Sequence, residues 1–113
     1  MKLVTAIVRP DRVGVVSAAL EQAGINGLTV SQASGFGRQR GHTEVYRGAE
    51  YSSDLLPKVR LEVLVDEDAL GAVMAAIEEG GRTGHFGDGK IWIIDVRDAV
   101  RVRTGERGAS AIA

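Results

Sequence analysis

Apolar residues recur along this chain with a period that predicts four β-strands. The third of these is the clearest, because valines and leucines alternate with charged residues along it. The first ends at Pro10, which lacks the N–H group that a central strand needs. The expected strands cover residues 3–9, 28–36, 58–65 and 90–96.

Two further segments have apolar residues at helical spacing. The first helix is expected to begin after Pro10 with Asp11 as its cap, and to end before Gly24. The second is expected to begin in the acidic run 66–68, where the helix dipole favours negative charge, and to stop at the glycines of 80–81.

The resulting order, βαββαβ, is that of the ferredoxin-like α+β fold, with two helices on one face of an antiparallel sheet. We expect one domain over residues 1–113. The second face of the sheet is also apolar, since Trp92 and Ile94 point away from Ile91 and Ile93. That face is expected to pack against other copies of the chain, or else to be covered by the C-terminal tail.

The connection over residues 37–55 is longer than most loops without secondary structure of their own. It is charged and contains Tyr46 and Tyr51. We interpret it as a surface for partner proteins; the alternative is a solvated insert.

Composition excludes several classes of protein. The chain has 113 residues, a formal net charge of −1 and no cysteine, so a general nucleic-acid binder, disulfides and thiolate chemistry are not expected. No leader pattern and no apolar run near about 18 residues is present, which predicts a cytoplasmic protein.

Two segments could bind phosphate. Gly87-Asp88-Gly89-Lys90 precedes the last strand, and glycines let main-chain N–H groups approach an anion; a plain glycine turn is the alternative. Arg101 and Arg103, two apart in a short extended stretch of the C-terminal segment 98–113, would share a face and suit phosphate oxygens; the alternative is a solvated edge. No nucleophile or carboxylate pair stands out, so we do not expect an enzyme.

Three motifs resemble the PII family of nitrogen-signalling proteins. Tyr46-Arg47-Gly48-Ala49-Glu50-Tyr51 fits the family's first signature, Thr83 to Lys90 resembles its second, and Arg101 to Glu106 resembles its C-terminal segment. The resemblance covers essentially the whole chain. It implies a homotrimeric signal-transduction protein that binds ATP or ADP, Mg²⁺ and 2-oxoglutarate.

The resemblance also implies roles for individual residues. The nucleotide would lie between subunits, and 37–55 and 82–90 would be the T-loop and the phosphate-side loop. Gln39 would help hold Mg²⁺, and Lys58 would pair with a 2-oxoglutarate carboxylate near Arg40 and Gly41. The implied nucleotide contacts are Thr29, Gly37, Arg38, Leu64, Gly87, Asp88, Gly89, Lys90, Arg101 and Arg103.

The T-loop would regulate an ammonium channel, enzymes that modify glutamine synthetase, or transcription regulators. Contact with nucleic acid would not be direct, and contact with a membrane would occur only through a channel. Tyr51 stands at the family's modification site. Arg40, His85 and Phe86 depart from common family residues. Two alternatives are a relative that senses only ATP and ADP, and a small phosphate-compound hydrolase.

Overall fold

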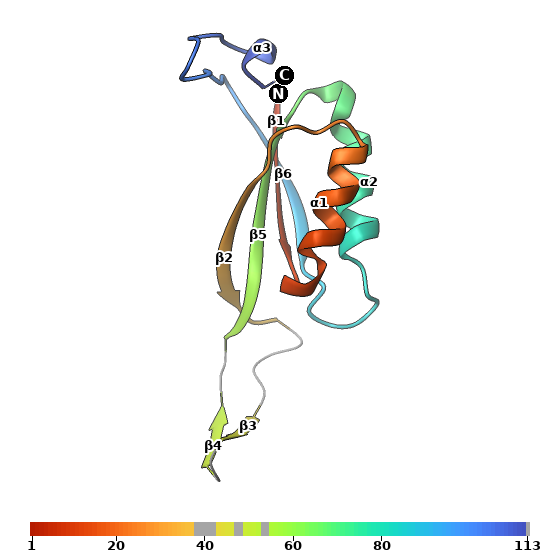
Figure 1. Ribbon diagram of the computed structural model, residues 1–113, viewed down its shortest axis with the longest axis vertical. Coiled ribbons are helices and arrows are strands. Elements are labelled where there is room, and N and C mark those ends of the chain that lie inside the picture. The colour runs from red at the N-terminus through yellow and green to blue at the C-terminus, as the bar shows by residue number, and fades with distance from the viewer. Residues whose placement is uncertain (38–42, 47–48, 53–54, 113) are drawn as a thin grey trace.

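The computed structural model describes residues 1–37 and 55–112, together with the backbone of two short strands at 43–46 and 49–52. Its body is a curved sheet with helices on one side, and a narrow hairpin extends from one end (Figure 1).

Four strands form one antiparallel sheet in the order β2-β5-β1-β6. Each predicted strand is present, with bounds that differ from the prediction by one or two residues, as expected for strand ends. The ferredoxin-like α+β architecture is therefore confirmed. The strands are β1 (Lys2–Val8), β2 (Thr29–Gly35), β5 (Leu56–Val65) and β6 (Lys90–Asp95).

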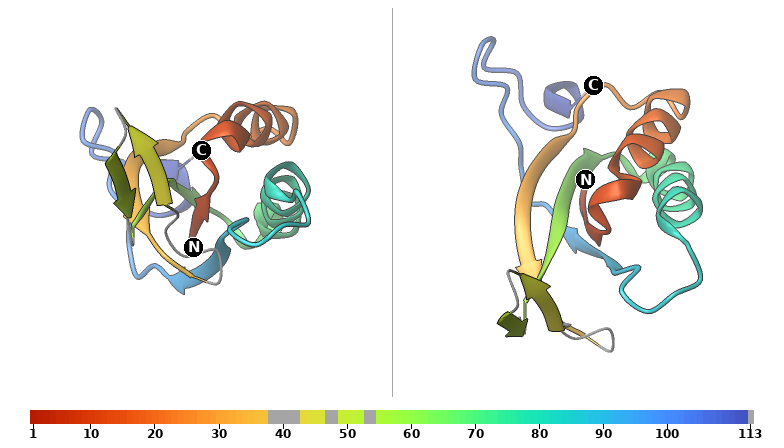
Figure 2. Two further views of the ribbon diagram at one scale, coloured as in Figure 1. Left: turned by 90° about the horizontal axis from the view of Figure 1, so that it is seen from below. Right: turned by 60° about the horizontal axis from the view of Figure 1, so that its bottom comes forward.

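Both long helices cover the same face of this sheet, as the views in Figure 2 show. α1 (Val13–Gln22) follows directly on a 3-10 turn, η1 (Pro10–Arg12). The prediction that Asp11 caps the helix is wrong, because Asp11 lies inside η1 and α1 has no side-chain cap. The main-chain carbonyl of Pro10, in the turn, instead accepts the amide hydrogen of Val13, the first residue of α1.

α1 ends as predicted before Gly24, which has a φ of 87°. The amides of Gly24 and Ile25 donate to the carbonyls of Glu21 and Leu20 respectively. This pattern is a Schellman motif, which favours glycine because an L side chain is strained at positive φ.

α2 (Glu67–Gly81) begins with acid in its first turn, as predicted, and includes both of the glycines that were expected to stop it. A Cβ atom at Gly80 would lie 3.2 Å from the Cα of Val16. The glycine therefore allows α1 and α2 to pack closely.

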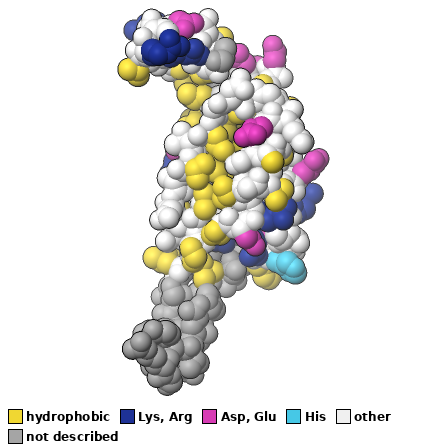
Figure 3. Space-filling model, viewed as in Figure 1, with side chains coloured by type: hydrophobic (Ala, Val, Ile, Leu, Met, Phe, Trp, Pro, Cys, Tyr) yellow, Lys and Arg dark blue, Asp and Glu magenta, His cyan; other side chains and the backbone are white. Residues whose placement is uncertain are grey.

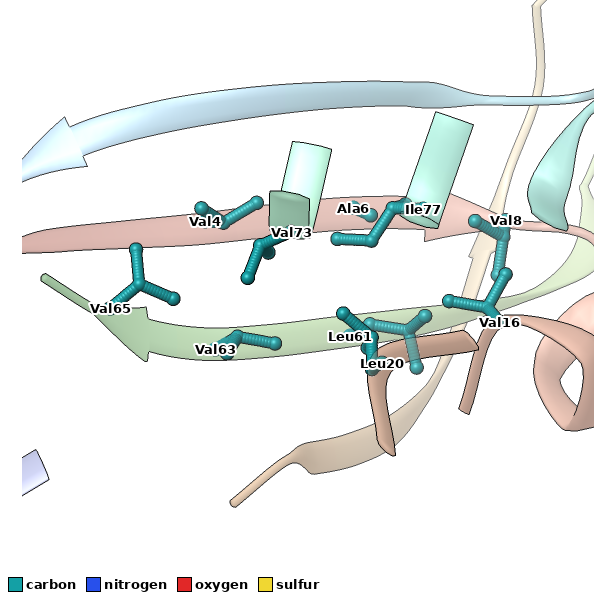
Figure 4. Close-up of a cluster of buried hydrophobic side chains, with 10 residues drawn as sticks. All are labelled: Val4, Ala6, Val8, Val16, Leu20, Leu61, Val63, Val65, Val73 and Ile77. Atoms are coloured by element: carbon teal, nitrogen blue, oxygen red, sulfur yellow. The ribbon is translucent and has the colours of Figure 1, made fainter. Parts of the chain in front are cut away.

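The core lies between the helices and the sheet. β1 and β5 each contribute three apolar side chains to it, and the helices contribute four (Figure 4). Burying aliphatic side chains in this way is the main favourable term in folding. These residues are Val4, Ala6, Val8, Leu61, Val63, Val65, Val16, Leu20, Val73 and Ile77.

The second face of the sheet remains partly uncovered in the single chain. Leu64 and Ile94 both pair with Leu3, and they are 41% and 51% exposed. The short C-terminal helix α3 (Ala109–Ile112) lines a groove near Leu3 and Leu64 but leaves these side chains accessible. The alternative that the tail covers this face is therefore wrong for the described residues.

The 37–55 connection is not wholly without secondary structure. β3 (Thr43–Tyr46) and β4 (Ala49–Ser52) pair as an antiparallel hairpin of their own. The expectation of an irregular loop is corrected to that extent, since main-chain pairing satisfies backbone groups that solvent would otherwise have to satisfy.

The C-terminal tail is not the extended strand that the alternation of Val100 to Arg103 suggested. Val100 and Arg107 form an isolated bridge, and the Arg101 carbonyl accepts hydrogen bonds from Thr104 and Gly105. The chain therefore turns back on itself before α3. Figure 3 shows Lys and Arg side chains gathered at this end of the molecule.

No helix in the part of the chain that the structure describes combines the length and the apolar character needed to cross a bilayer.

Candidate functional site

The segment between α2 and β6 is a glycine-containing loop, residues 82–89, organised by the carboxylate of Asp88. One oxygen of that carboxylate accepts the amides of Thr83 and Gly84, each at 2.8 Å, and the other accepts the Thr83 hydroxyl. These bonds hold the pKa of Asp88 well below its usual range, with the Thr83 hydroxyl as the largest cause. Asp88 is thus ionised, and both of its carboxylate oxygens accept hydrogen bonds from its own loop.

Arg9, just beyond the end of β1, ties this loop to the sheet. Its Nε donates to Asp88 Oδ1 at 2.9 Å, and its Nη2 donates to the Phe86 carbonyl. The Arg9 and Asp88 side chains are only 21% and 23% exposed, so this ion pair is largely shielded from solvent. Planar guanidinium groups suit such two-point contacts.

Lys58, on β5, reaches the same loop from another strand. Its Nζ donates to the Gly87 carbonyl at 2.7 Å. Desolvation lowers the pKa of Lys58 from its ordinary 10.5, the Arg9 charge lowers it further, and Asp88 opposes the shift. Burial makes the charged form of a lysine less stable. An anionic ligand therefore stabilises a partly buried ammonium group more than it stabilises an exposed one.

Gly89 packs against the backbone of β1. It has a φ of 93°, and a Cβ atom there would lie 1.6 Å from the Ile7 carbonyl oxygen. Only glycine fits this position. Lys90 follows as the first residue of β6, pairs in register with Ile7, and is exposed.

The residues expected at the adenine side lie elsewhere. Thr29 and Leu64 line a groove of about 900 Å³ together with the 24–28 segment, Glu62, and Ala111 and Ile112 of α3. Leu64 pairs with Leu3, whereas Lys90 pairs with Ile7. At about 3.3 Å per residue, the two sites are offset by about 13 Å along β1.

They are also separated across the sheet. Thr29 begins one edge strand, β2, and Lys90 begins the other, β6. With neighbouring strands about 4.8 Å apart, three spacings amount to about 14 Å. A single chain therefore does not bring the expected adenine contacts and the expected phosphate contacts together.

The two arginines of the tail are not paired on one strand face, because residues 101–105 form a turn. Arg101 donates to the carbonyl of Ser110 at 3.3 Å and lies 3.7 Å from Glu106, while Arg103 is exposed. The prediction that the two side chains share one face of a strand is therefore wrong.

Several expected site residues lie outside the described part of the chain, namely Arg38, Gln39, Arg40 and Gly41. Gly37 follows the end of β2, and Tyr51 lies in β4, where only the backbone is described. Their expected roles remain predictions.

Arg9 and Thr83 are parts of this site that were not predicted from the sequence. Arg9 is 79 residues from Asp88 along the chain, and no local spacing joins them. The one available signal was the position of Arg9 directly before Pro10, at the end of a strand. A Thr-x-x-x-x-Asp pair, with four residues between the two side chains, could have suggested that Thr83 closes the loop.

The fold and this site define a ferredoxin-like domain with a fixed glycine loop beside two partly buried cations, Arg9 and Lys58. Within the described residues, no group of three or more His, Cys, Asp or Glu side chains could hold a metal ion. Glycine loops and nearby cations are features that anion sites in proteins commonly use.

Comparison with known proteins identifies the family. The family model described as nitrogen regulatory protein P-II matches residues 1–106. Nitrogen regulatory protein P-II of Mesorhizobium japonicum and that of Azospirillum brasilense are each 49% identical over 112 residues, 99% of this chain and 100% of theirs. Nitrogen regulatory protein P-II 1 of Escherichia coli is 47% identical over the same coverage.

The chain belongs to the nitrogen regulatory protein P-II family. Members of this family are regulatory signal-transduction proteins that act on partner proteins, and they are not enzymes. The hydrolase alternative is therefore set aside.

Proposed function

We propose that this protein binds ATP or ADP and 2-oxoglutarate and reports them to partner proteins through the 37–55 loop. The observation that carries this proposal is the fixed glycine loop, in which Arg9, Lys58 and Asp88 hold residues 83–89 beside Lys90. A bound nucleotide would supply the phosphate charge that such a loop is built to receive.

The nucleotide site is shared between copies of the chain in a homotrimer. The separation of Thr29 and Leu64 from the 87–90 segment supports this, since each chain offers two half-sites at different ends and edges of its sheet. The partly exposed apolar side chains of the second face, Leu64, Trp92 and Ile94, would then pack between copies.

The fit of the effector to the described residues rests on Lys58. A partly buried ammonium group that lies beside Arg9 suits a ligand carboxylate, and 2-oxoglutarate carries two. Gln39 would contribute to the Mg²⁺ site and Arg40 and Gly41 to the effector site, as the resemblance implies.

The regulated partners are an ammonium channel, glutamine-synthetase-modifying enzymes or transcription regulators in the cytoplasm. Ligands that contact both Lys58 and the base of the 37–55 loop would shift the population of its conformations. Tyr51, within the hairpin strand β4, would be the position for covalent modification.

Calorimetric titration of 2-oxoglutarate with Mg-ATP, with Mg-ADP and without nucleotide tests this function. We expect binding only with Mg-ATP. Binding of ATP without any binding of 2-oxoglutarate would replace the proposal with a sensor of ATP and ADP alone. Absence of nucleotide binding altogether would overturn it.

The affinity for 2-oxoglutarate should fall in the alkaline range. Because the pKa of Lys58 is lowered, its ammonium deprotonates below the ordinary 10.5. Affinity is then full below the lowered pKa and is lost as the pH rises through it, since the neutral amine cannot pair with a carboxylate. Calorimetry at saturating Mg-ATP between about pH 7 and 10.5 measures this fall.

The Lys58→Arg variant is the control for this prediction. A guanidinium stays charged throughout the range, so any binding that the variant retains should not fall with pH. An affinity of the native protein that stays constant up to pH 10.5 would contradict the prediction.

A further inference from the structure

Asp88 poses an electrostatic difficulty for the proposed phosphate site. A carboxylate at the centre of a loop that receives polyphosphate would repel its ligand. Its three donors within the loop are the amides of Thr83 and Gly84 and the hydroxyl of Thr83, which are neutral groups. They satisfy the oxygens of the carboxylate but leave its charge in place.

Arg9 supplies the compensating charge. It is the cation that directly contacts Asp88, at 2.9 Å, among the ion pairs of the described residues. Lys58 donates to the Gly87 carbonyl instead. In the proposed function, the charge of Lys58 pairs with a carboxylate of 2-oxoglutarate. The Arg9 and Asp88 side chains are both partly buried, so solvent screens their interaction only partly.

The second hydrogen bond of Arg9 adds a positional role. Nη2 donates to the Phe86 carbonyl while Nε holds Asp88, so one guanidinium fixes the loop on both sides of Gly87. The amide of Gly87 and the start of β6 are thereby set in place relative to β1. A lysine ammonium in this position would keep the charge but not the planar fork.

We propose that Arg9 is a positioning residue for nucleotide binding, which neutralises Asp88 and locks the 83–89 loop in the conformation that receives phosphate. This inference rests on the proposed nucleotide function. The role of Arg9 has two parts: its charge neutralises Asp88, and its planar guanidinium fixes the loop. The part that depends on charge can be tested separately.

Calorimetric titration of Mg-ATP into four proteins tests it: the native chain, Arg9→Gln, Asp88→Asn and the double variant. Loss of a hydrogen bond to a charged group predicts that Arg9→Gln binds ATP about tenfold to a hundredfold more weakly. Removing the carboxylate charge as well should restore part of that loss. A role in stability alone predicts that the double variant binds no better than Arg9→Gln.

Arg12→Gln is the matched control. Arg12 is three residues away and also donates to a main-chain carbonyl, that of Gly80 at 2.8 Å, but it does not contact the loop. This variant should bind ATP as the native protein does. Arg9→Lys should bind with intermediate affinity, since it keeps the charge and loses the contact with Phe86.

Amide hydrogen exchange in the ligand-free protein separates this inference from the proposed function. In Arg9→Gln, the amides of Thr83 and Gly84 should exchange faster, because their acceptor Asp88 is no longer held, and in Arg12→Gln they should not. If the native protein fails to bind ATP, the proposed function fails. Native ATP affinity in Arg9→Gln, unchanged exchange, or no recovery in the double variant would each overturn the inference.

Discussion

Replacing Gly89 with alanine should displace the 82–89 loop and abolish nucleotide binding. The added Cβ would lie 1.6 Å from the Ile7 carbonyl oxygen and 2.7 Å from its carbon. Both are main-chain atoms of β1, in the middle of the sheet, so no flexible side chain can move aside. Relief requires the first residues of β6 to separate from β1, where Lys90 pairs with Ile7.

The expected cost is at least about 3 kcal/mol in the free energy of unfolding, which combines positive-φ strain with loss of packing. This is a large fraction of the stability of a small domain. Denaturant unfolding measures the cost, and calorimetry with Mg-ATP should show affinity reduced by more than about a hundredfold, since the loop no longer lies against β1.

Gly84→Ala separates the steric effect from backbone strain. Gly84 lies in the same loop with a φ of 87°, but a Cβ there has no atom within 4 Å. We expect a cost of only about 1–2 kcal/mol, from positive φ alone. Equal effects of the two substitutions on stability and on ATP affinity would show that the contact with Ile7 is not decisive.

Replacing Lys58 with methionine should remove 2-oxoglutarate binding. Methionine keeps most of the length and apolar volume of the side chain and deletes the ammonium. Loss of one member of a partly buried charge pair predicts an affinity at least about thirtyfold weaker, and as much as a thousandfold. The measurement is calorimetric titration of 2-oxoglutarate at saturating Mg-ATP.

ATP affinity should fall much less in this variant, because Lys58 contacts the nucleotide loop at a main-chain carbonyl, that of Gly87. Lys2→Met is the control: Lys2 pairs with Asp95 and Glu67 at the other end of the sheet. It should leave 2-oxoglutarate binding unchanged. Binding by Lys58→Met within about threefold of the native affinity would refute the assignment of Lys58 as the effector's partner.

The two wrong predictions, an extended tail and a helix cap at Asp11, have the same physical cause. Arg101 and Arg103 alternate with valines, but alternation describes a strand only where a neighbouring strand pairs with it. Here Val100 meets Arg107 in a single bridge, and the chain turns between them. Asp11 is likewise a residue type that often caps helices. Here it lies inside η1, and main-chain carbonyls accept the amide hydrogens at this point of the chain.

The sequence by itself determined the order of the main strands and helices and the family of the protein. Those features follow from local periodicity, such as the alternation over 58–65, and from motifs that are contiguous in the chain. It also identified Gly87 to Lys90 as a candidate phosphate site, because glycine and lysine residues can be recognised without knowledge of the fold.

Only the tertiary structure decided how that site is held. Arg9 and Asp88 are 79 residues apart, Lys58 and Gly87 are 29 apart, and the sheet brings all four to one end. It also showed that Thr29 and Leu64 lie away from Lys90 in a single chain. Contacts between distant segments depend on strand pairing and on helix packing, and neither can be read from local spacing along the chain.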